Sequence, residues 1–464
     1  MGLSAMDDKR DRVVEFYDRA LVGEQVGERQ FDTRILPAKL RELVATFEIR
    51  MTPGEFVPMD LDMARRVLEA GVELLADLGV YCTDTERLIA ISRDEIETAL
   101  EESPESFQQG CGAQTVKVRA RGLDDTRAPS VNNGSCGSPM SEEAVVPALA
   151  SCAMEDIDGL VTGYLKSVLG RETRARTPIE LLACKKEVIY ARQSLEIAGK
   201  PGLSILGIMS GGNSESQDAC TFEGGLRASD RHLNVFDNEL KLSFDTLNRV
   251  LHDAYAGTGT VSAIAPMLGG YCGGPESTAI CGVAEVLASR VIFDNQCMGS
   301  WVESIWQDYA SPQWLWVAGM LSLAFVAAGQ HLVTGNWLGG NAGPWTAVQC
   351  REMAAQSVAV IACGSSIVHG FNGNAGTVED HVTGMESRML VEVSRAAAGM
   401  SVTDANDIVG RVLAGYEGLC KPGNAPFGKS FFECYDADSL QPKEEFVAFW
   451  EAEKADLRSC GLPL

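Results

Sequence analysis

The sequence predicts an α/β protein, a (β/α)8 or TIM barrel with helical N- and C-terminal extensions. Two observations predict this fold. From about residue 126 to about residue 400, short apolar runs that end in Gly or Asn alternate with longer segments of helical character. Residues 1–125 and 401–464 lack this alternation and look helical. Repeated βα alternation is typical of a parallel barrel covered by helices.

Residues 1–125 are expected to form an outer helical extension that packs on the barrel. Residues 62–78 place apolar side chains at helical spacing. Ser92 and Glu95 have the spacing of a capping box, which predicts a second helix at 92–100. At the other end, residues 401–464 again look helical, and Pro422 and Pro426 mark a loop.

The catalytic domain is expected at residues 126–400. A helix is predicted at 177–198, because Thr177 and Pro178 form a cap and first turn. The strand candidates are short apolar runs bounded by Gly or polar residues. They lie at 160–163, 203–207, 260–268, 298–302, 332–335 and 367–370.

Two stretches, 254–275 and 309–350, contain no Asp, Glu, Lys or Arg. Their length alone would suit membrane spans. Gly and Pro interrupt the first stretch, and Asn336, Asn341, Pro312 and Pro344 interrupt the second. We therefore interpret both as interior strands and loops of a soluble barrel.

Composition excludes several classes of function. The chain has 464 residues, with 39 Lys and Arg against 64 Asp and Glu, a net charge of −25. This balance disfavours nucleic acid and anionic membranes as partners. The 14 cysteines contain no Cys-x-x-Cys pair and are expected to be reduced. Together with an N-terminus too charged for a signal peptide, these features predict a cytoplasmic protein.

Several distinctive runs occur in a fixed order along the chain. They are 16–24 (FYDRALVGE), 79–85 (GVYCTDT), 137–142 (GSPMSE), 199–208 (GKPGLSILGI), 267–274 (MLGGYCGG), 383–390 (TGMESRML) and 429–436 (KSFFECYD). From about residue 16 to about residue 461 the chain resembles the monomethylamine:corrinoid protein methyltransferases of methylotrophic methanogens. The resemblance implies a TIM barrel that methylates the Co(I) corrinoid of a small partner protein and binds no cofactor tightly itself. It also implies a homo-oligomer, a hexamer in that family.

The resemblance also identifies where this chain departs from the family. Leu206 stands where the family has pyrrolysine, whose imine carbon is thought to capture the amine. Ala263 stands where the family has a pocket glutamate. After Gly335 and Asn336 the family has Gln-Tyr-Tyr, whereas this chain has Trp337, Leu338 and Gly339. Because three polar contacts to the amine are absent together, we expect a more apolar pocket and a substrate other than monomethylamine.

A methyl donor whose leaving atom already carries positive charge suits such a pocket. A quaternary ammonium or a sulfonium needs no acid, and aromatic rings hold such cations. Aromatic residues gather in the second half of the barrel, namely Trp301, Trp306, Trp314, Trp316, Trp337, Trp345 and Tyr271. Trp301 and Trp337 directly follow strand candidates, and Tyr271 follows a glycine-rich run, so these three are our aromatic candidates for substrate binding. Core packing is the alternative explanation for each ring.

Glu276, Glu303 and His369 are candidate catalytic groups, because each stands at the expected end of a strand. Asn372 is a further substrate-binding candidate. The two glutamates have an alternative explanation as charges at helix N-termini. His331 lies on an apolar stretch and is expected to be a core histidine. Cys272, Cys363 and the two histidines show no zinc-ligand spacing, so no metal site is predicted.

Three functions therefore stay open. The first is a corrinoid-dependent methyltransferase that acts on a pre-activated methyl donor other than monomethylamine. The second is another TIM-barrel enzyme, such as a lyase, that shares only the scaffold. The third is a catalytically silent relative of the methylamine methyltransferases that is retained for assembly.

Overall fold

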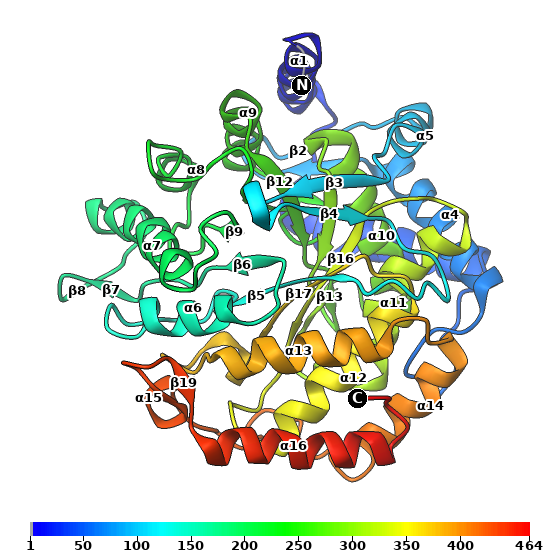
Figure 1. Ribbon diagram of the computed structural model, residues 1–464. Coiled ribbons are helices and arrows are strands. Elements are labelled where there is room, and N and C mark those ends of the chain that lie inside the picture. The colour runs from blue at the N-terminus through cyan, green and yellow to red at the C-terminus, as the bar shows by residue number, and fades with distance from the viewer. Residues whose placement is uncertain (1–2) are drawn as a thin grey trace.

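Eight parallel strands close into a barrel in the order in which they occur along the chain (Figure 1). The computed structural model describes residues 3–464, and side chains from residue 9 onward. The strands are β5 (Ser130–Gly134), β6 (Gly159–Val161), β9 (Ser204–Gly207), β10 (Arg231–Val235), β12 (Gly259–Ile264), β14 (Cys297–Ser300), β16 (Thr334–Gly339) and β17 (Ile367–Asn372). The predicted (β/α)8 barrel is confirmed.

Helices follow the strands and cover the outside of the barrel. They are α6 (Val145–Met154), α7 (Pro178–Ile197), α8 (Ser214–Asp218), α9 (Phe244–Ala256), α10 (Pro275–Phe293), α11 (Pro312–Ala327), α12 (Ala347–Ala362) and α13 (Gly384–Ala397). The predicted cap at 177–198 is present, since the Thr177 side chain accepts a hydrogen bond from Glu180 N.

The N-terminal segment is not wholly helical, which corrects the sequence-based prediction. It has the expected helices α1 (Leu3–Val22), α2 (Glu28–Gln30), α3 (Leu36–Thr46), α4 (Leu61–Leu78) and α5 (Arg93–Glu101), together with a π-helical turn at Phe31–Ile35. It also contains the strands β1 (Val80–Cys82), β2 (Arg87–Ile89), β3 (Ser106–Gln109) and β4 (Val116–Arg119). The β3–β4 hairpin closes the amino end of the barrel, because Phe107 and Val118 belong to the interior cluster of buried side chains.

The uncharged stretch 309–350 contains strand β16 and loops as predicted, but much of its first half is a helix, which corrects the prediction. This helix is α11, in which Trp314 and Trp316 are fully buried. The helix packs against α4, α10 and α12 and is apolar on every side. A helix buried all round lacks the one-sided pattern that identifies a surface helix, and its composition resembles a buried strand. No helix within residues 3–464 is long and apolar enough to span a bilayer.

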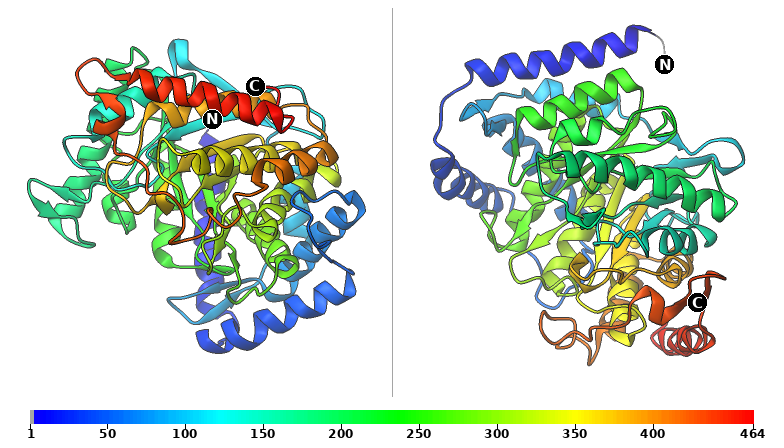
Figure 2. Two further views of the ribbon diagram at one scale, coloured as in Figure 1. Left: turned by 90° about the horizontal axis from the view of Figure 1, so that it is seen from below. Right: turned by 90° about the vertical axis from the view of Figure 1, so that its left-hand side faces the viewer.

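The C-terminal segment contains α14 (Val402–Leu413), α15 (Phe431–Cys434) and α16 (Glu444–Ser459). Helix α16 lies along α13, where Trp450 Nε1 donates to Glu392 at 3.1 Å. Helices α1 and α16 lie on opposite sides of the barrel (Figures 1 and 2). Helix α1 and helix α16 flank the barrel, while the segment between α14 and α15 reaches the loops after β16 and β17 through Cys420 O and Phe427 O.

Candidate active site

A stacked pair of rings fills the barrel interior at the middle of β16 and β17. Trp337 and His369 are register partners, and their ring centroids lie 4.5 Å apart at an interplanar angle of 17°. Two glycines make room for this pair. A Cβ on Gly335 would lie 2.7 Å from His369 Nε2, and one on Gly299 would lie 2.9 Å from Trp337 Nε1. Larger residues at either position would displace a ring.

His369 is held as a neutral imidazole. Burial lowers its pKa to about 3. Gln109 Nε2 donates to Asn132 Oδ1 at 2.9 Å, which orients the Asn132 amide so that its Nδ2 faces His369 Nδ1 at 3.5 Å. The imidazole proton is then assigned to Nε2, which lies 4.0 Å from Cys297 Sγ. A ring so buried and so weakly basic supports Trp337 and is a poor proton donor.

The stacked pair forms the floor of the candidate pocket. The mouth above this floor is formed by Trp301, Glu303, Gly339 and Asn372. Trp301 Nε1 donates to Glu303 Oε1. A Cβ on Gly339 would lie 2.1 Å from Asn372 Oδ1 and 2.7 Å from Trp301 Cη2, so the small residue lets the two side chains meet. Burial raises the pKa of Glu303. Asn372 Nδ2 donates to Cys136 O at 3.3 Å, while its buried Oδ1 has no hydrogen-bond partner.

Leu206 and Ala263 complete the apolar wall. Leu206 is 1% exposed and belongs to the same interior cluster as Trp337. Ala263 and Met209 are partly buried and pack against that cluster. The structure therefore brings together seven of the ten predicted site residues, namely Leu206, Ala263, Trp301, Glu303, Trp337, Gly339 and Asn372, with His369 as an eighth below them.

Glu276 and Tyr271 lie apart from this group. Glu276 sits in the first turn of α10, where its Oε1 accepts a hydrogen bond from Met51 N at 3.0 Å and ties the N-terminal extension to the barrel. Tyr271 is 49% exposed in the loop after β13 (Met267–Leu268). Trp345 stacks on Phe446 of α16, and Trp306 is exposed. His331 is exposed and not a core residue, because it precedes β16 at the surface.

Buried carboxylates on the outer helices hold the loops that carry the site, and sequence reasoning missed them. Glu187 of α7 accepts hydrogen bonds from Met209 N at 2.9 Å and Ser210 N at 2.7 Å, just after Leu206. Glu352 of α12 accepts from Asn341 N at 3.0 Å and Ala342 N at 3.1 Å, just after Gly339. Acidic residues within otherwise buried helices were the available signal.

Burial makes the charged form of both carboxylates unfavourable. Burial raises the pKa of Glu352 to about 8, although the two backbone N–H groups oppose the shift. Burial likewise raises the pKa of Glu187. Gln356 holds the same β16 end without charge, since it accepts from Gly339 N at 3.1 Å and donates to Gly339 O at 2.7 Å. Among the described side chains, no three His, Cys, Asp or Glu groups are arranged to hold a metal ion.

Comparison with known proteins places this barrel in a family. The family described as monomethylamine methyltransferase MtmB matches residues 12–462. The chain belongs to the MtmB family. Monomethylamine methyltransferase MtmB2 of Methanosarcina acetivorans is 34% identical over 454 residues, which cover 97% of each chain. MtmB1 of Methanosarcina barkeri is 33% identical over 456 residues, again 97% of each.

Solved structures of MtmB have the same fold. The crystal structure of the Methanosarcina barkeri enzyme superposes with a TM-score of 0.94 at 32% identity, covering 97% of this chain and 98% of that one. The hydroxylamine complex of MtmB matches equally well, with the same coverage. The predicted family is therefore confirmed, and with it membership in a group of methyltransferases.

Proposed function

We propose that this chain transfers a methyl group from a small, permanently cationic donor to the Co(I) corrinoid of a partner protein. A quaternary ammonium or another pre-activated methyl compound fits the pocket better than monomethylamine does. The observation that carries the proposal is the stack of Trp337 on neutral His369 in the barrel interior, below the carboxyl ends of the strands. Trp301 and Leu206 extend the same apolar surface.

The reaction balances without a proton. The Co(I) electron pair attacks the methyl carbon, the carbon–nitrogen bond breaks, and its electrons return to nitrogen. The products are methyl-Co(III) and a neutral tertiary amine. Monomethylamine would have to leave as ammonia and would need its proton held during transfer. His369, with its pKa of about 3, does not suit the role of holding a donor proton at neutral pH.

Each side chain of the pocket has a separate role in binding the donor. Trp337 offers the ring face that is not covered by His369, and Trp301 is a second ring held by Glu303. When Glu303 is ionised, it supplies the countercharge to the donor cation. Asn372 Oδ1 is a free acceptor at the same mouth and suits a partly positive methyl group or a polar end of the donor. Leu206 and Ala263 shape the wall.

The partner protein has to bring its corrinoid to this mouth. Tyr271, Ile305 and Trp306 are about half exposed, on the loops next to β13 and β15 (Glu303–Ser304), which pair directly above β12 and β14. Asn341 Nδ2 links this rim to the C-terminal segment through Gln307 O at 2.6 Å and Cys420 O at 2.8 Å. An exposed apolar rim beside a candidate active site is a suitable binding surface for a partner protein.

A thermal-shift screen of the full chain tests the donor class. Tetramethylammonium, a betaine and trimethylsulfonium should each raise the melting temperature in a saturable way, and methylammonium should not. Selective stabilisation by methylammonium would contradict the proposal, because it would indicate a site for a protonated primary amine. We also propose a homo-oligomer, as in the resembled family. Light scattering at micromolar concentration that gave only the monomer mass of 49.8 kDa would refute that part.

A further inference from the structure

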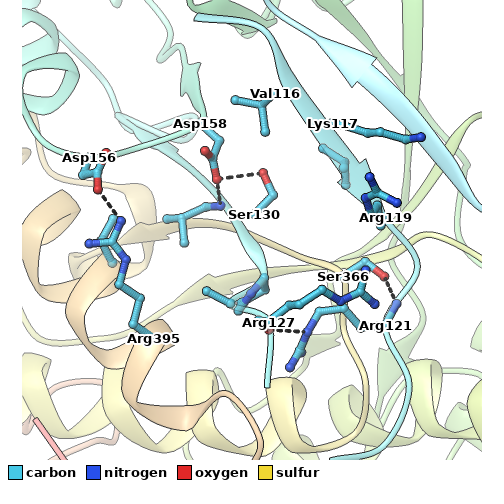
Figure 3. A pocket seen from close by; sticks show the side chains of 15 residues that line it. Val116, Lys117, Arg119, Arg121, Arg127, Ser130, Asp156, Asp158, Ser366 and Arg395 are labelled. Carbon is cyan, nitrogen blue, oxygen red and sulfur yellow. Dashed lines mark hydrogen bonds and ion pairs between the residues drawn. The ribbon is translucent and has the colours of Figure 1, made fainter. Parts of the chain in front are cut away.

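A cationic cavity lies at the amino end of the barrel, opposite the candidate active site (Figure 3). It has a volume of about 330 Å³ and is formed by β4, the start of β5, the segment before β6, and α13. Five cations line it, namely Lys117, Arg119, Arg121, Arg127 and Arg395, against the two carboxylates of Asp156 and Asp158. This concentration of positive charge stands out in a chain whose net charge is −25.

Both carboxylates in the wall are already occupied. Asp158 Oδ2 accepts hydrogen bonds from Ser130 Oγ at 3.0 Å and Val131 N at 2.8 Å. Asp156 pairs with Arg395, as Figure 3 shows. Arg127 is likewise paired with Asp125, which lies outside the wall. These two ion pairs neutralise themselves. Asp158 accepts only from neutral donors, so it contributes at most one negative charge against the remaining cations of the cavity.

Three positive charges remain without an acidic partner. Arg121 donates to the backbone carbonyls of Arg127, Ser365, Ile361 and Asp125, which satisfy its hydrogens without cancelling its charge. Lys117 and Arg119 lie on one face of β4, are exposed, and make no side-chain hydrogen bond or ion pair within the described residues. The opposite face of the strand places Val118 in the barrel interior.

We propose that this cavity binds a phosphate-type oxyanion, with Arg119 and Lys117 as its main ligands. A guanidinium fork matches two oxygens of a phosphate, and the ammonium adds a point charge. The volume lies at the lower end of the range for small-ligand pockets and exceeds what one phosphate fills. The oxyanion can therefore be inorganic phosphate or the phosphate of a small metabolite. A bound anion would tie the β3–β4 hairpin to α13 and β5.

The test is calorimetric titration of the full chain with sodium phosphate and, separately, with ribose 5-phosphate, in chloride buffer at constant ionic strength. Saturable one-site binding of either is the expected result. Tighter binding of ribose 5-phosphate would identify a phosphorylated metabolite as the ligand, and equal or weaker binding would identify free phosphate. Heat that does not saturate, or that chloride reproduces, would overturn the proposal.

Two double variants test whether the anion binds at Lys117 and Arg119. The Lys117→Gln/Arg119→Gln double variant should weaken binding at least about tenfold, because it removes two charge-assisted contacts. The Arg41→Gln/Lys421→Gln variant changes the net charge equally, at exposed cations that make no side-chain hydrogen bond or ion pair within residues 9–464, and should change affinity less than about twofold. Equal losses in the two variants would contradict the site. So would a change of molar mass without phosphate binding, since the cavity would then be a contact between copies of the chain.

Discussion

At the scale of single residues, the indole of Trp337 decides whether the pocket binds a cation. Trp337 is 7% exposed, its Nε1 has no hydrogen-bond partner, and one of its faces is covered by His369. An unsatisfied buried donor is unfavourable, so packing against the other ring and the glycines has to hold the indole there. We expect a donor cation to contact the face of the ring opposite His369.

Replacing Trp337 with Leu keeps apolar volume but removes the ring. Affinity for a methylated cation should then fall about 5- to 30-fold, from the ~1–2 kcal/mol of a desolvated cation–π contact. A neutral methyl compound should be far less affected. Titration calorimetry with tetramethylammonium measures this. Trp306→Leu is the matched control, because it removes an exposed indole from the rim and should leave the affinity unchanged.

His369 should remain neutral throughout the physiological pH range. Burial lowers its pKa to about 3, well below the ordinary value for histidine. NMR of the protein labelled with ¹³C-histidine should show one imidazole whose chemical shift stays constant from pH 8 to pH 5. If instead every imidazole titrates near pH 6.5, His369 is open to solvent and the packed floor does not exist as described.

At the scale of the elements, buried glutamates that bind loop N–H groups make the stability of the fold depend on pH. Glu352 binds the two backbone N–H groups that follow β16. Its folded-state pKa of about 8 lies above the unfolded value, so the folded state binds the extra proton between about pH 4.5 and pH 8. The Glu352 contribution to stability is therefore largest below pH 4.5 and is lost as the pH rises through 8.

The Glu352→Gln variant cannot ionise and should not show this loss. It will be less stable than the parent chain at low pH, because an amide replaces one acceptor oxygen with a donor. Its melting temperature relative to the parent should rise steadily between pH 5 and pH 8.5. Paired thermal melts in matched buffers measure the difference. A difference that stayed constant over this range would show that Glu352 titrates normally.

The elements also show what sequence could and could not predict. All six strand candidates contain or overlap barrel strands, because they are apolar runs ending at small residues. Strands β5 and β10 were missed because they are polar, with Asn132 and Asn133 in one and Arg231, His232 and Asn234 in the other. These side chains are buried and most make hydrogen bonds there, such as His232 Nδ1 to Asp253 at 2.7 Å. Hydrophobic patterning cannot detect a strand whose interior contacts are polar.

Part of the candidate site was predictable from the positions of its residues relative to the strands. Trp301 and Asn372 stand at or just beyond the end of a strand, and Trp337 stands two residues before one. Parallel strands bring such positions together. The orientation of Glu276 was not predictable, since the hydrogen bond it accepts comes from Met51, 225 residues earlier in the chain. Nor was the stack of His369 under Trp337, which depends on the absence of side chains at Gly299 and Gly335.

At the scale of the whole molecule, the two ends of the barrel differ in their surroundings. The amino end is closed by the β3–β4 hairpin and carries the cationic cavity. The carboxyl end carries the candidate active site and the apolar rim of Tyr271, Ile305 and Trp306. If the rim receives the corrinoid protein, its loss should affect reaction with that protein and leave the chemistry of the pocket intact.

The Ile305→Ser/Trp306→Ser variant separates these effects. Methyl transfer to free cobalamin in the Co(I) state should be unchanged, while transfer to the corrinoid protein purified from the source organism should fall at least about tenfold. Ile189→Ser/Ile197→Ser, which removes two exposed apolar side chains from α7, should affect neither reaction. Equal rates for all three proteins with the corrinoid protein would show that the partner binds elsewhere.

The most direct test of the central claim is methyl transfer itself. The full chain is mixed anaerobically with free Co(I) cobalamin and either tetramethylammonium or monomethylamine, and formation of methyl-Co(III) is followed by absorbance against samples without protein. We expect protein-dependent methylation from the quaternary donor, a lower rate in Trp337→Leu, and no methylation from monomethylamine. Robust methylation from monomethylamine by the chain with Leu206 would contradict this expectation.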